Sequence, residues 1–203
     1  MSAKQSNVKQ NLINTCELAI LTAIVFLFQM LGSFVHIGPT SVSLVLIPIV
    51  IGAIIIGPGA GAFLGFIFGF ITLYAGISGT DPFTSALFNA SPFFTSLLCI
   101  GKGTLCGLAA GLVYKPLGKK NTFAASVAAA ATSPIVNTGI FILGGLFLLK
   151  APLSVISGGQ DVVYFLVIVC AGLNFIAEFA VNIVVSPAIN TLVKALASRI
   201  IRK

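Results

Sequence analysis

Lys102 is the residue whose position most directly indicates chemistry, because it interrupts an otherwise apolar run over residues 91–114. A charged side chain in hydrocarbon costs about 2.5–3.5 kcal/mol on insertion scales, so such a residue usually faces a cavity, a partner or a ligand. Glu178, in the last apolar run, is the carboxylate expected at a comparable depth. Two interpretations follow: a structural ion pair between helices, or a polar binding pocket inside a helical bundle, which we favour.

Two asparagines are expected at the depth of Lys102. Counted inward at a helical rise of about 1.5 Å per residue, Lys102, Asn137 and Asn174 each lie about 11 or 12 residues from the outer end of their apolar run. Glu178 follows Asn174 at i+4 on the same helix face, and Asn182 continues this stripe inward. Lys102, Asn137, Asn174 and Glu178 are therefore the predicted substrate-binding residues of the bundle.

The composition defines the class of protein that must position these side chains. Hydrophobic residues make up 58% of the chain and charged residues 7%, and the mean hydropathy is +1.13. Charged residues are about a quarter of an ordinary soluble domain, so this composition indicates an integral membrane protein. The 203 residues fit a single membrane domain over 1–203, with no room for a soluble catalytic module.

The apolar sequence divides into six predicted spans of about 20 residues each. They cover residues 14–34, 42–57, 60–77, 91–114, 123–149 and 162–192. The first is preceded by a polar stretch and lacks a clear cleavage site, which indicates a retained helix rather than a signal peptide. We therefore predict an all-α bundle of six transmembrane helices with both termini on one side.

The basic residues predict which side faces the cytoplasm, where Lys and Arg near span ends accumulate. Lys150 falls on the side away from the termini. The basic residues on the side of the termini are Lys4, Lys9, Lys115, Lys119, Lys120, Lys194, Arg199, Arg202 and Lys203. Both termini are thus predicted to be cytoplasmic, and the net charge of +7 needs no nucleic-acid partner.

The outer segment over residues 78–94 mixes turn residues with aromatics, a composition typical of a loop that folds over a bundle. Asn89 and Phe93 from this segment join the predicted substrate site. Residues 36–41, between the first two spans, are a second candidate for such a lid. The alternative is that both segments only connect helices.

Motifs of catalysis and energy conversion are missing. The sequence contains no phosphate-binding G-x-x-x-x-G-K-[ST], no H-E-x-x-H and no G-x-S-x-G, and it has one histidine. The cysteines Cys16, Cys99, Cys106 and Cys170 all fall within predicted spans and form no C-x-x-C pair. We expect no enzyme activity, no ATPase activity in this chain, no disulfide, no metal and no cofactor.

Small residues recur at four-residue spacing on three of the predicted helices, a pattern that lets helix backbones approach closely. The three sets are Gly57, Gly61, Gly65 and Gly69; Gly103, Gly107 and Gly111; and Ala19 and Ala23. Packing within the bundle is one explanation, and a docking surface for another membrane protein is the other. For the first helix we favour docking through Ala19 and Ala23.

Three segments together resemble one known family. They are PIVIGAIIIGPGAGAFLG at 48–65, ALFNASPF at 86–93 and PIVNTG at 134–139. These segments are similar to the substrate-binding S components of energy-coupling factor (ECF) transporters, and the resemblance extends over nearly the whole chain. It implies six spans with cytoplasmic termini, capture of a vitamin near the outer face of a bacterial cell membrane, and no ATPase of its own.

The resemblance also implies partners. In the family an A-x-x-x-A motif of the first helix docks against a transmembrane T component, and Ala19 and Ala23 match that motif. Two separate ATPase subunits supply the energy, in agreement with the missing phosphate-binding loop.

The cargo suggested by the resemblance is pantothenate, whose carboxylate would pair with Lys102 while the amide and acidic side chains bind its hydroxyl and amide groups. Riboflavin, pyridoxine and folate remain open as other cargoes. A different class also remains open, a self-sufficient secondary transporter that uses Lys102 and Glu178 as a proton-coupled pair. A purely structural membrane subunit, which binds no small molecule, is the third possibility.

Overall fold

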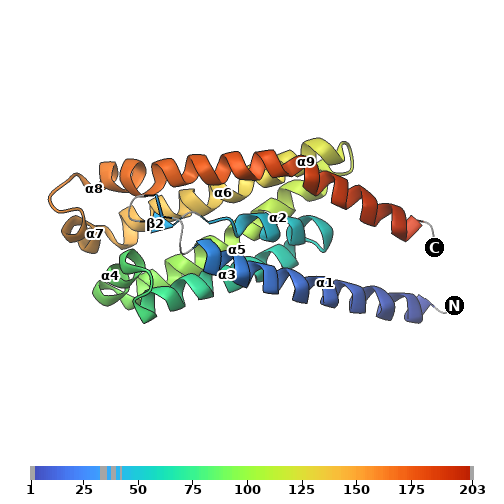
Figure 1. Cartoon of the computed structure of the whole chain (residues 1–203), viewed down its shortest axis with the longest axis horizontal. Helices are drawn as coiled ribbons and strands as arrows, with labels where there is room; N and C mark the ends of the chain where they lie inside the picture. Colours follow the sequence, from blue (N-terminus) through green and yellow to red (C-terminus); the bar gives the residue numbers. More distant parts are fainter. Residues whose placement is uncertain (1–2, 33–35, 38–39, 42, 202–203) are drawn as a thin grey trace.

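Helices account for nearly all of the chain, and five of them are long and apolar enough to cross a membrane (Figure 1). The structure, a computed structural model, describes residues 3–32, 36–37, 40–41 and 43–201. Residues 38–39 of the second lid candidate and the basic residues Arg202 and Lys203 lie outside this described part.

The elements follow one another along the chain as a helical bundle with one small hairpin. Their bounds are α1 (Ala3–Gly32), β1 (His36–Ile37), β2 (Thr40–Ser41), α2 (Leu46–Ile55), α3 (Pro58–Ser78), α4 (Pro82–Ala90), α5 (Pro92–Leu117), α6 (Thr122–Leu148), α7 (Lys150–Ile156), α8 (Val162–Tyr164), the π-helical segment η1 (Phe165–Gly172) and α9 (Leu173–Ile201). The strands β1 and β2 pair antiparallel, with His36 opposite Ser41, and are the departure from the all-α prediction in the described residues.

Five of the predicted spans are confirmed as long apolar helices. The candidate spans of the structure are Val8–Gly32, Pro58–Ser78, Pro92–Leu117, Thr122–Leu148 and Val162–Ala195. The sixth prediction, over residues 42–57, corresponds to α2, which is 10 residues long. At about 1.5 Å per residue such a helix is about half the thickness of a hydrocarbon core, so α2 alone is too short to span it.

The short α2 ends where the sequence breaks the helix. Gly57 has φ 133° and ψ 175°, a conformation that side chains with a Cβ disfavour, and Pro58 then begins α3. Both Ile56 and Gly57 donate their N–H groups to the carbonyl of Gly52, which closes the turn. The chain therefore reverses within two residues, and α2 packs directly against α3.

The predicted loop over residues 78–94 is wrong in its secondary structure, because most of it forms α4. Asp81 caps this helix: its Oδ1 accepts the N–H groups of Phe83 at 3.1 Å and Thr84 at 3.2 Å, and its Oδ2 accepts the Thr84 hydroxyl at 2.9 Å. Pro82 occupies the first turn, where no N–H is needed. Phe83 and Leu87, one turn apart, are buried in the core at this end of the bundle.

The glycine sets of α3 and α5 pack against each other, which confirms the packing explanation for these two helices. A Cβ on Gly65 would overlap the carbonyl of Gly103, and a Cβ on Gly103 would overlap the carbonyl of Gly65. Gly61 and Gly107 have the same relation one turn farther along. The two backbones are therefore in direct contact, which only residues without a side chain allow.

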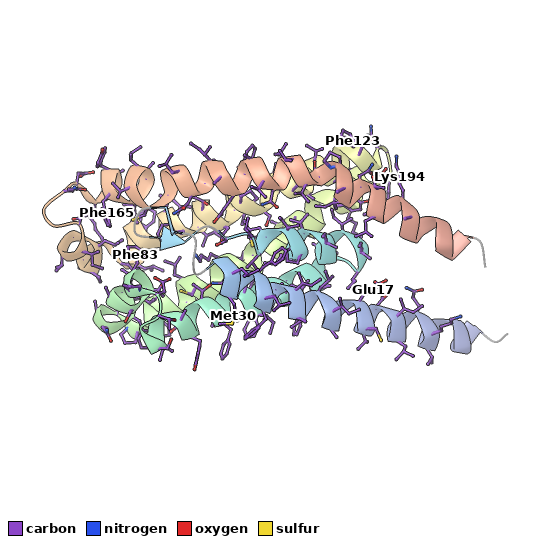
Figure 2. The ribbon with its side chains drawn as sticks, viewed as in Figure 1. Glu17, Met30, Phe83, Phe123, Phe165 and Lys194 are labelled. Carbon is purple, nitrogen blue, oxygen red and sulfur yellow. The ribbon has the colours of Figure 1, made fainter. Side chains whose placement is uncertain are left out.

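The outer surface of the bundle is apolar, as expected of helices that face lipid or another membrane protein. Side chains such as Met30 and Phe123 point outward (Figure 2), with 54% and 47% of their surface exposed. Buried polar side chains lie instead on the inside, among them Asn137, Glu178 and Asn182. Both chain ends lie at one end of the bundle, opposite α4, α7 and α8 (Figure 1).

The contact between α3 and α5 predicts a position-specific effect of adding one methyl group to α5. Gly103→Ala should lower the apparent melting temperature in detergent, because the new Cβ would meet the backbone of α3 and overpacking costs about 1–3 kcal/mol. Gly101→Ala is the matched control on the same helix, since nothing lies within 4 Å of its Cβ position. Equal melting temperatures for the two variants would contradict the close contact.

Candidate functional site

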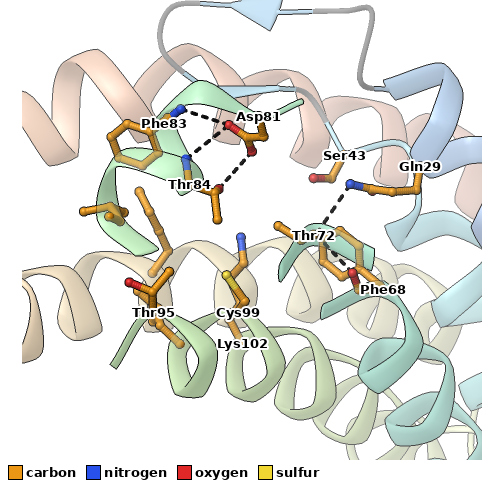
Figure 3. A pocket seen from close by; sticks show the side chains of 13 residues that line it. Gln29, Ser43, Phe68, Thr72, Asp81, Phe83, Thr84, Thr95, Cys99 and Lys102 are labelled. Atoms are coloured by element: carbon orange, nitrogen blue, oxygen red, sulfur yellow. Dashed lines mark hydrogen bonds between the residues drawn. The ribbon is translucent and has the colours of Figure 1, made fainter. Parts of the chain in front are cut away.

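Two cavities open inside the end of the bundle that carries α4 and α8. The first, the α4 cavity, has an empty volume of about 550 Å³ with its opening included and lies between α3, α4 and α5 (Figure 3). The second, the α9 cavity, has about 380 Å³ and lies between α6, η1 and α9.

The α9 cavity brings together the four polar residues predicted within the bundle. Lys102 comes from α5, Asn137 from α6, and Asn174 and Glu178 from the start of α9. Counting residues inward from the span ends therefore placed side chains from three helices at one level. Thr138 lines the same cavity.

Lys102 lines both cavities, and its amine is held by aromatic rings. Nζ lies 5.7 Å from the ring centroid of Phe68 on α3 and 5.5 Å from that of Phe141 on α6. Among the described residues, no carboxylate oxygen comes within 4.0 Å of this amine. The ring faces stabilise the ammonium without neutralising it, so the charge is available to a ligand and no ion pair with Glu178 forms.

Glu178 connects α9 to the segment before α2. Its side chain is 4% exposed, and Oε1 accepts the backbone N–H of Ser43 at 2.8 Å. The Asn182 amide donates to the Glu178 backbone carbonyl at 2.8 Å, so the polar stripe of α9 is ordered in part by its own helix. A buried carboxylate facing a polar cavity suits a ligand that carries hydrogen-bond donors.

Asn137 is 5% exposed, and within the described part of the chain its Oδ1 has no hydrogen-bond partner. A buried carbonyl oxygen left in this state costs about 1–3 kcal/mol, which a ligand donor would offset. On the facing wall, the Asn174 amide donates to the carbonyl of Cys170 at 3.1 Å. Cys170 belongs to η1, and π-helical turns occur frequently at functional sites.

The structure does not bring Asn89 and Phe93 into this group. Both side chains are exposed, Phe93 to 72%, and neither lines a cavity described above. The reason is the helical phase of α4 and the start of α5, which turns Phe83, Thr84 and Leu87 inward and leaves Asn89 outside. Phe93 contacts Phe94 at a ring separation of 5.5 Å on the outer surface.

Most of the α4 cavity was missed by sequence reasoning. Its additional polar residues are Gln29, Thr72, Asp81, Thr84 and Thr95. A single threonine or glutamine in an apolar helix is weak evidence for a binding site, because its side chain often forms a hydrogen bond within its own helix. Asp81 was detectable, since Asp followed by Pro before an apolar stretch is a typical helix start.

Ala19 and Ala23 lie away from both cavities, on the exposed face of α1. Leu21 and Val25 form the opposite face and are buried against α2 and α3. The small residues of α1 are therefore available to another membrane component.

The polar side chains that line the two cavities suit the binding of a small polar molecule. Among the described residues no group of three or more His, Cys, Asp or Glu side chains could hold a metal ion. The cysteines form no disulfide with one another.

Comparison with known proteins identifies the family. A family model described as "ECF transporter, substrate-specific component" matches residues 16–190. A solved structure of ThiT from Listeria monocytogenes is similar in fold, with a TM-score of 0.64 and 18% identity over 92% of this chain and 96% of that chain. No curated protein matched the chain. The chain belongs to the substrate-specific S components of ECF transporters, which are non-enzymatic, multi-pass transport subunits of the cell membrane that work with a substrate and an energy-coupling module.

Proposed function

We propose that this S component captures a water-soluble vitamin from outside the cell, with pantothenate as the first candidate, and delivers it together with a T component and two ATPases. The observation that carries the proposal is the Lys102 ammonium, which faces both cavities with no carboxylate within 4.0 Å among the described residues. A carboxylate ligand would supply the missing counter-charge through charge-assisted hydrogen bonds.

The remaining groups fit the other end of such a molecule. Pantothenate carries an amide N–H and two hydroxyl groups besides its carboxylate. Asn137 and Glu178 offer buried oxygen acceptors in the α9 cavity, adjacent to Lys102. The amide and hydroxyl groups of the ligand would donate to these acceptors. One small molecule would thus supply both the counter-charge for Lys102 and the hydrogen-bond donors for the α9 cavity.

For the membrane arrangement we propose six crossings with both termini in the cytoplasm. The two chain ends lie at the same end of the bundle, which supports an even number of crossings (Figure 1). The crossing that α2 is too short to make would then include the segment preceding it. Exposed Lys115, Lys119, Lys120 and Lys194 agree with a cytoplasmic location of their helix ends.

The main alternative to this proposal is a different vitamin rather than a different class of protein. Phe68, Phe83 and Phe141 line the α4 cavity and could stack on a ring such as that of riboflavin, pyridoxine or thiamine. The self-sufficient secondary transporter loses support, because the chain belongs to a family whose members depend on an energy-coupling module. Lys102 and Glu178 also form no ion pair that would serve as a coupling element.

Isothermal titration of the purified chain in detergent against pantothenate, riboflavin, pyridoxine, folate, biotin and thiamine tests the proposal. We expect one-to-one binding of a single vitamin, pantothenate, by the chain without its partners. Binding of a different vitamin would replace the cargo, and binding of none would refute capture by the chain alone.

Lys102→Met should weaken pantothenate binding by about 10- to 100-fold, because a hydrogen bond to a charged group contributes about 1.5–3 kcal/mol. Methionine keeps most of the side-chain length and removes the charge. Lys115→Met is the control, since Lys115 is exposed at the far end of the same helix and should leave the Kd unchanged. Unchanged affinity in Lys102→Met would remove Lys102 from the site.

The double substitution Ala19→Leu and Ala23→Leu should abolish co-purification with the T component and leave the Kd for the vitamin unchanged. Two added side chains on the exposed face of α1 would prevent a close helix contact without reaching either cavity. Ala180→Leu, at an exposed position of α9, is the control and should assemble normally. Normal assembly of the double variant would exclude this surface as the docking site.

A further inference from the structure

The two cavities meet at three shared residues. Ser43, Lys102 and Phe141 line both the α4 cavity and the α9 cavity, so the Lys102 amine stands at their junction. Figure 3 shows the Lys102 side chain pointing into the α4 cavity, below Asp81 and Thr84. A molecule that binds Lys102 can therefore extend into either cavity or across both.

Thr95 differs from six other threonines of the long helices. These six donate their hydroxyl to the carbonyl four residues earlier: Thr15, Thr22, Thr72, Thr104, Thr132 and Thr191. Among the described residues, the hydroxyl of Thr95 finds no hydrogen-bond partner, although Thr95 is 1% exposed and lines the α4 cavity. A buried hydroxyl without a partner destabilises the protein unless a bound molecule supplies one.

The side chains of Thr95 and Lys102 both line the α4 cavity. They are seven residues apart on α5, which places them on one helix face about 10.5 Å apart along the axis. Helical side chains tilt toward the N-terminus, so Lys102 leans toward Thr95, and Cys99 lies between them in the cavity wall. The Thr95 hydroxyl and the Lys102 ammonium thus provide hydrogen-bond donors to one region.

The other polar groups of the α4 cavity are already engaged. Both Asp81 oxygens accept hydrogen bonds from the start of α4, and the Thr84 hydroxyl donates to Asp81. The Thr72 hydroxyl donates to the carbonyl of Phe68 at 3.0 Å. Thr95 and Lys102 are therefore the groups in this cavity that we assign to ligand oxygen atoms.

The α9 cavity, which shares Lys102 with the α4 cavity, adds hydrogen-bond acceptors. The Glu178 carboxylate and the Asn137 Oδ1 atom are hydrogen-bond acceptors, and both side chains are nearly fully buried. An acidic group on the ligand would be repelled there by Glu178, whereas the charge of Asp81 in the α4 cavity is offset by its three hydrogen bonds from the start of α4. An N–H or O–H group would be bound.

We propose that the two cavities form one bipartite site, in which Thr95 and Lys102 hold the acidic end of the substrate and Asn137 and Glu178 hold its hydroxyl or amide donors. The inference rests on the proposed function and adds an orientation and a specificity-determining residue, Thr95. The substrate class is a linear molecule with an acidic group at one end and N–H or O–H donors at the other.

The experiment compares two ligands on four forms of the protein by isothermal titration. The ligands are pantothenate and pantothenol, which has a hydroxymethyl group in place of the carboxylate. The proteins are the wild type, Thr95→Val, Asn137→Ala and Thr104→Val. Valine removes the hydroxyl at constant shape, and Thr104 is the matched control because it lies on the same helix, bonds its own helix and lines neither cavity.

Thr95→Val should weaken pantothenate binding by about tenfold and pantothenol binding by much less, because a hydrogen bond to a charged group is the stronger one. Asn137→Ala should weaken both ligands by the same factor, and Thr104→Val should change neither. If Thr95→Val leaves pantothenate binding unchanged, or weakens both ligands equally, the bipartite orientation is wrong while the proposed function stands.

A wild type that binds another vitamin of the panel would overturn pantothenate as cargo. If that vitamin is biotin or folate, which carry a carboxylate, the same variants are compared with it and with its analogue lacking the carboxylate, and an equal effect of Thr95→Val on the pair overturns the inference. Binding of riboflavin, pyridoxine or thiamine, which have no acidic group, overturns the inference directly. Failure of the wild type to bind every member would overturn the proposed function and this inference with it.

Discussion

The direct backbone contact between α3 and α5 is the constraint on which the rest of the structure depends. Gly65 and Gly103 exclude any side chain between the two helices, so the register of α5 against α3 is fixed at the residue next to Lys102. This register places the Lys102 amine over the ring of Phe68 from α3. It also turns Thr95 and Cys99 of α5 toward the space that α4 covers. Small residues thus determine the geometry of the charged site, although they contact no ligand themselves.

The second half of the site is less tightly constrained. Asn137 and Phe141 come from α6, and Asn174 and Glu178 follow the π-helical segment η1 at the start of α9. Only Lys102, Ser43 and Phe141 belong to both cavities. The proposed substrate site therefore lies between the closely packed pair α3 and α5 and the elements α6, η1 and α9. A ligand that occupies both cavities would contact α5 on one side and α6 and α9 on the other, and would so connect these helices.

The sequence predicted the features that depend on composition and regular spacing. Long apolar runs identified five helices, and counting residues inward identified Lys102, Asn137, Asn174 and Glu178 as neighbours of one cavity. The short α2 was overestimated because the apolar run continues through residues that do not form helix. Thr95 was missed because its environment depends on which helix lies opposite. Asn89 and Phe93 were assigned to the site without knowledge of the helical phase, and that phase places them outside.

A comparison of like residues separates structural polar groups from those that face a ligand. Asp81 and Glu178 are both carboxylates that line the cavities: both oxygens of Asp81 accept hydrogen bonds from α4, and Glu178 accepts hydrogen bonds from Ser43 and Asn137 in the wall of the α9 cavity. Thr104 satisfies its hydroxyl within α5, whereas Thr95 on the same helix does not. A membrane interior provides no bulk water to satisfy such groups, so each group left without a protein partner adds to the free energy available for binding. The proposed affinity of this apolar bundle for a polar molecule therefore depends on the Thr95 hydroxyl and the Asn137 Oδ1, which lack hydrogen-bond partners among the described residues, and on the charge of Lys102.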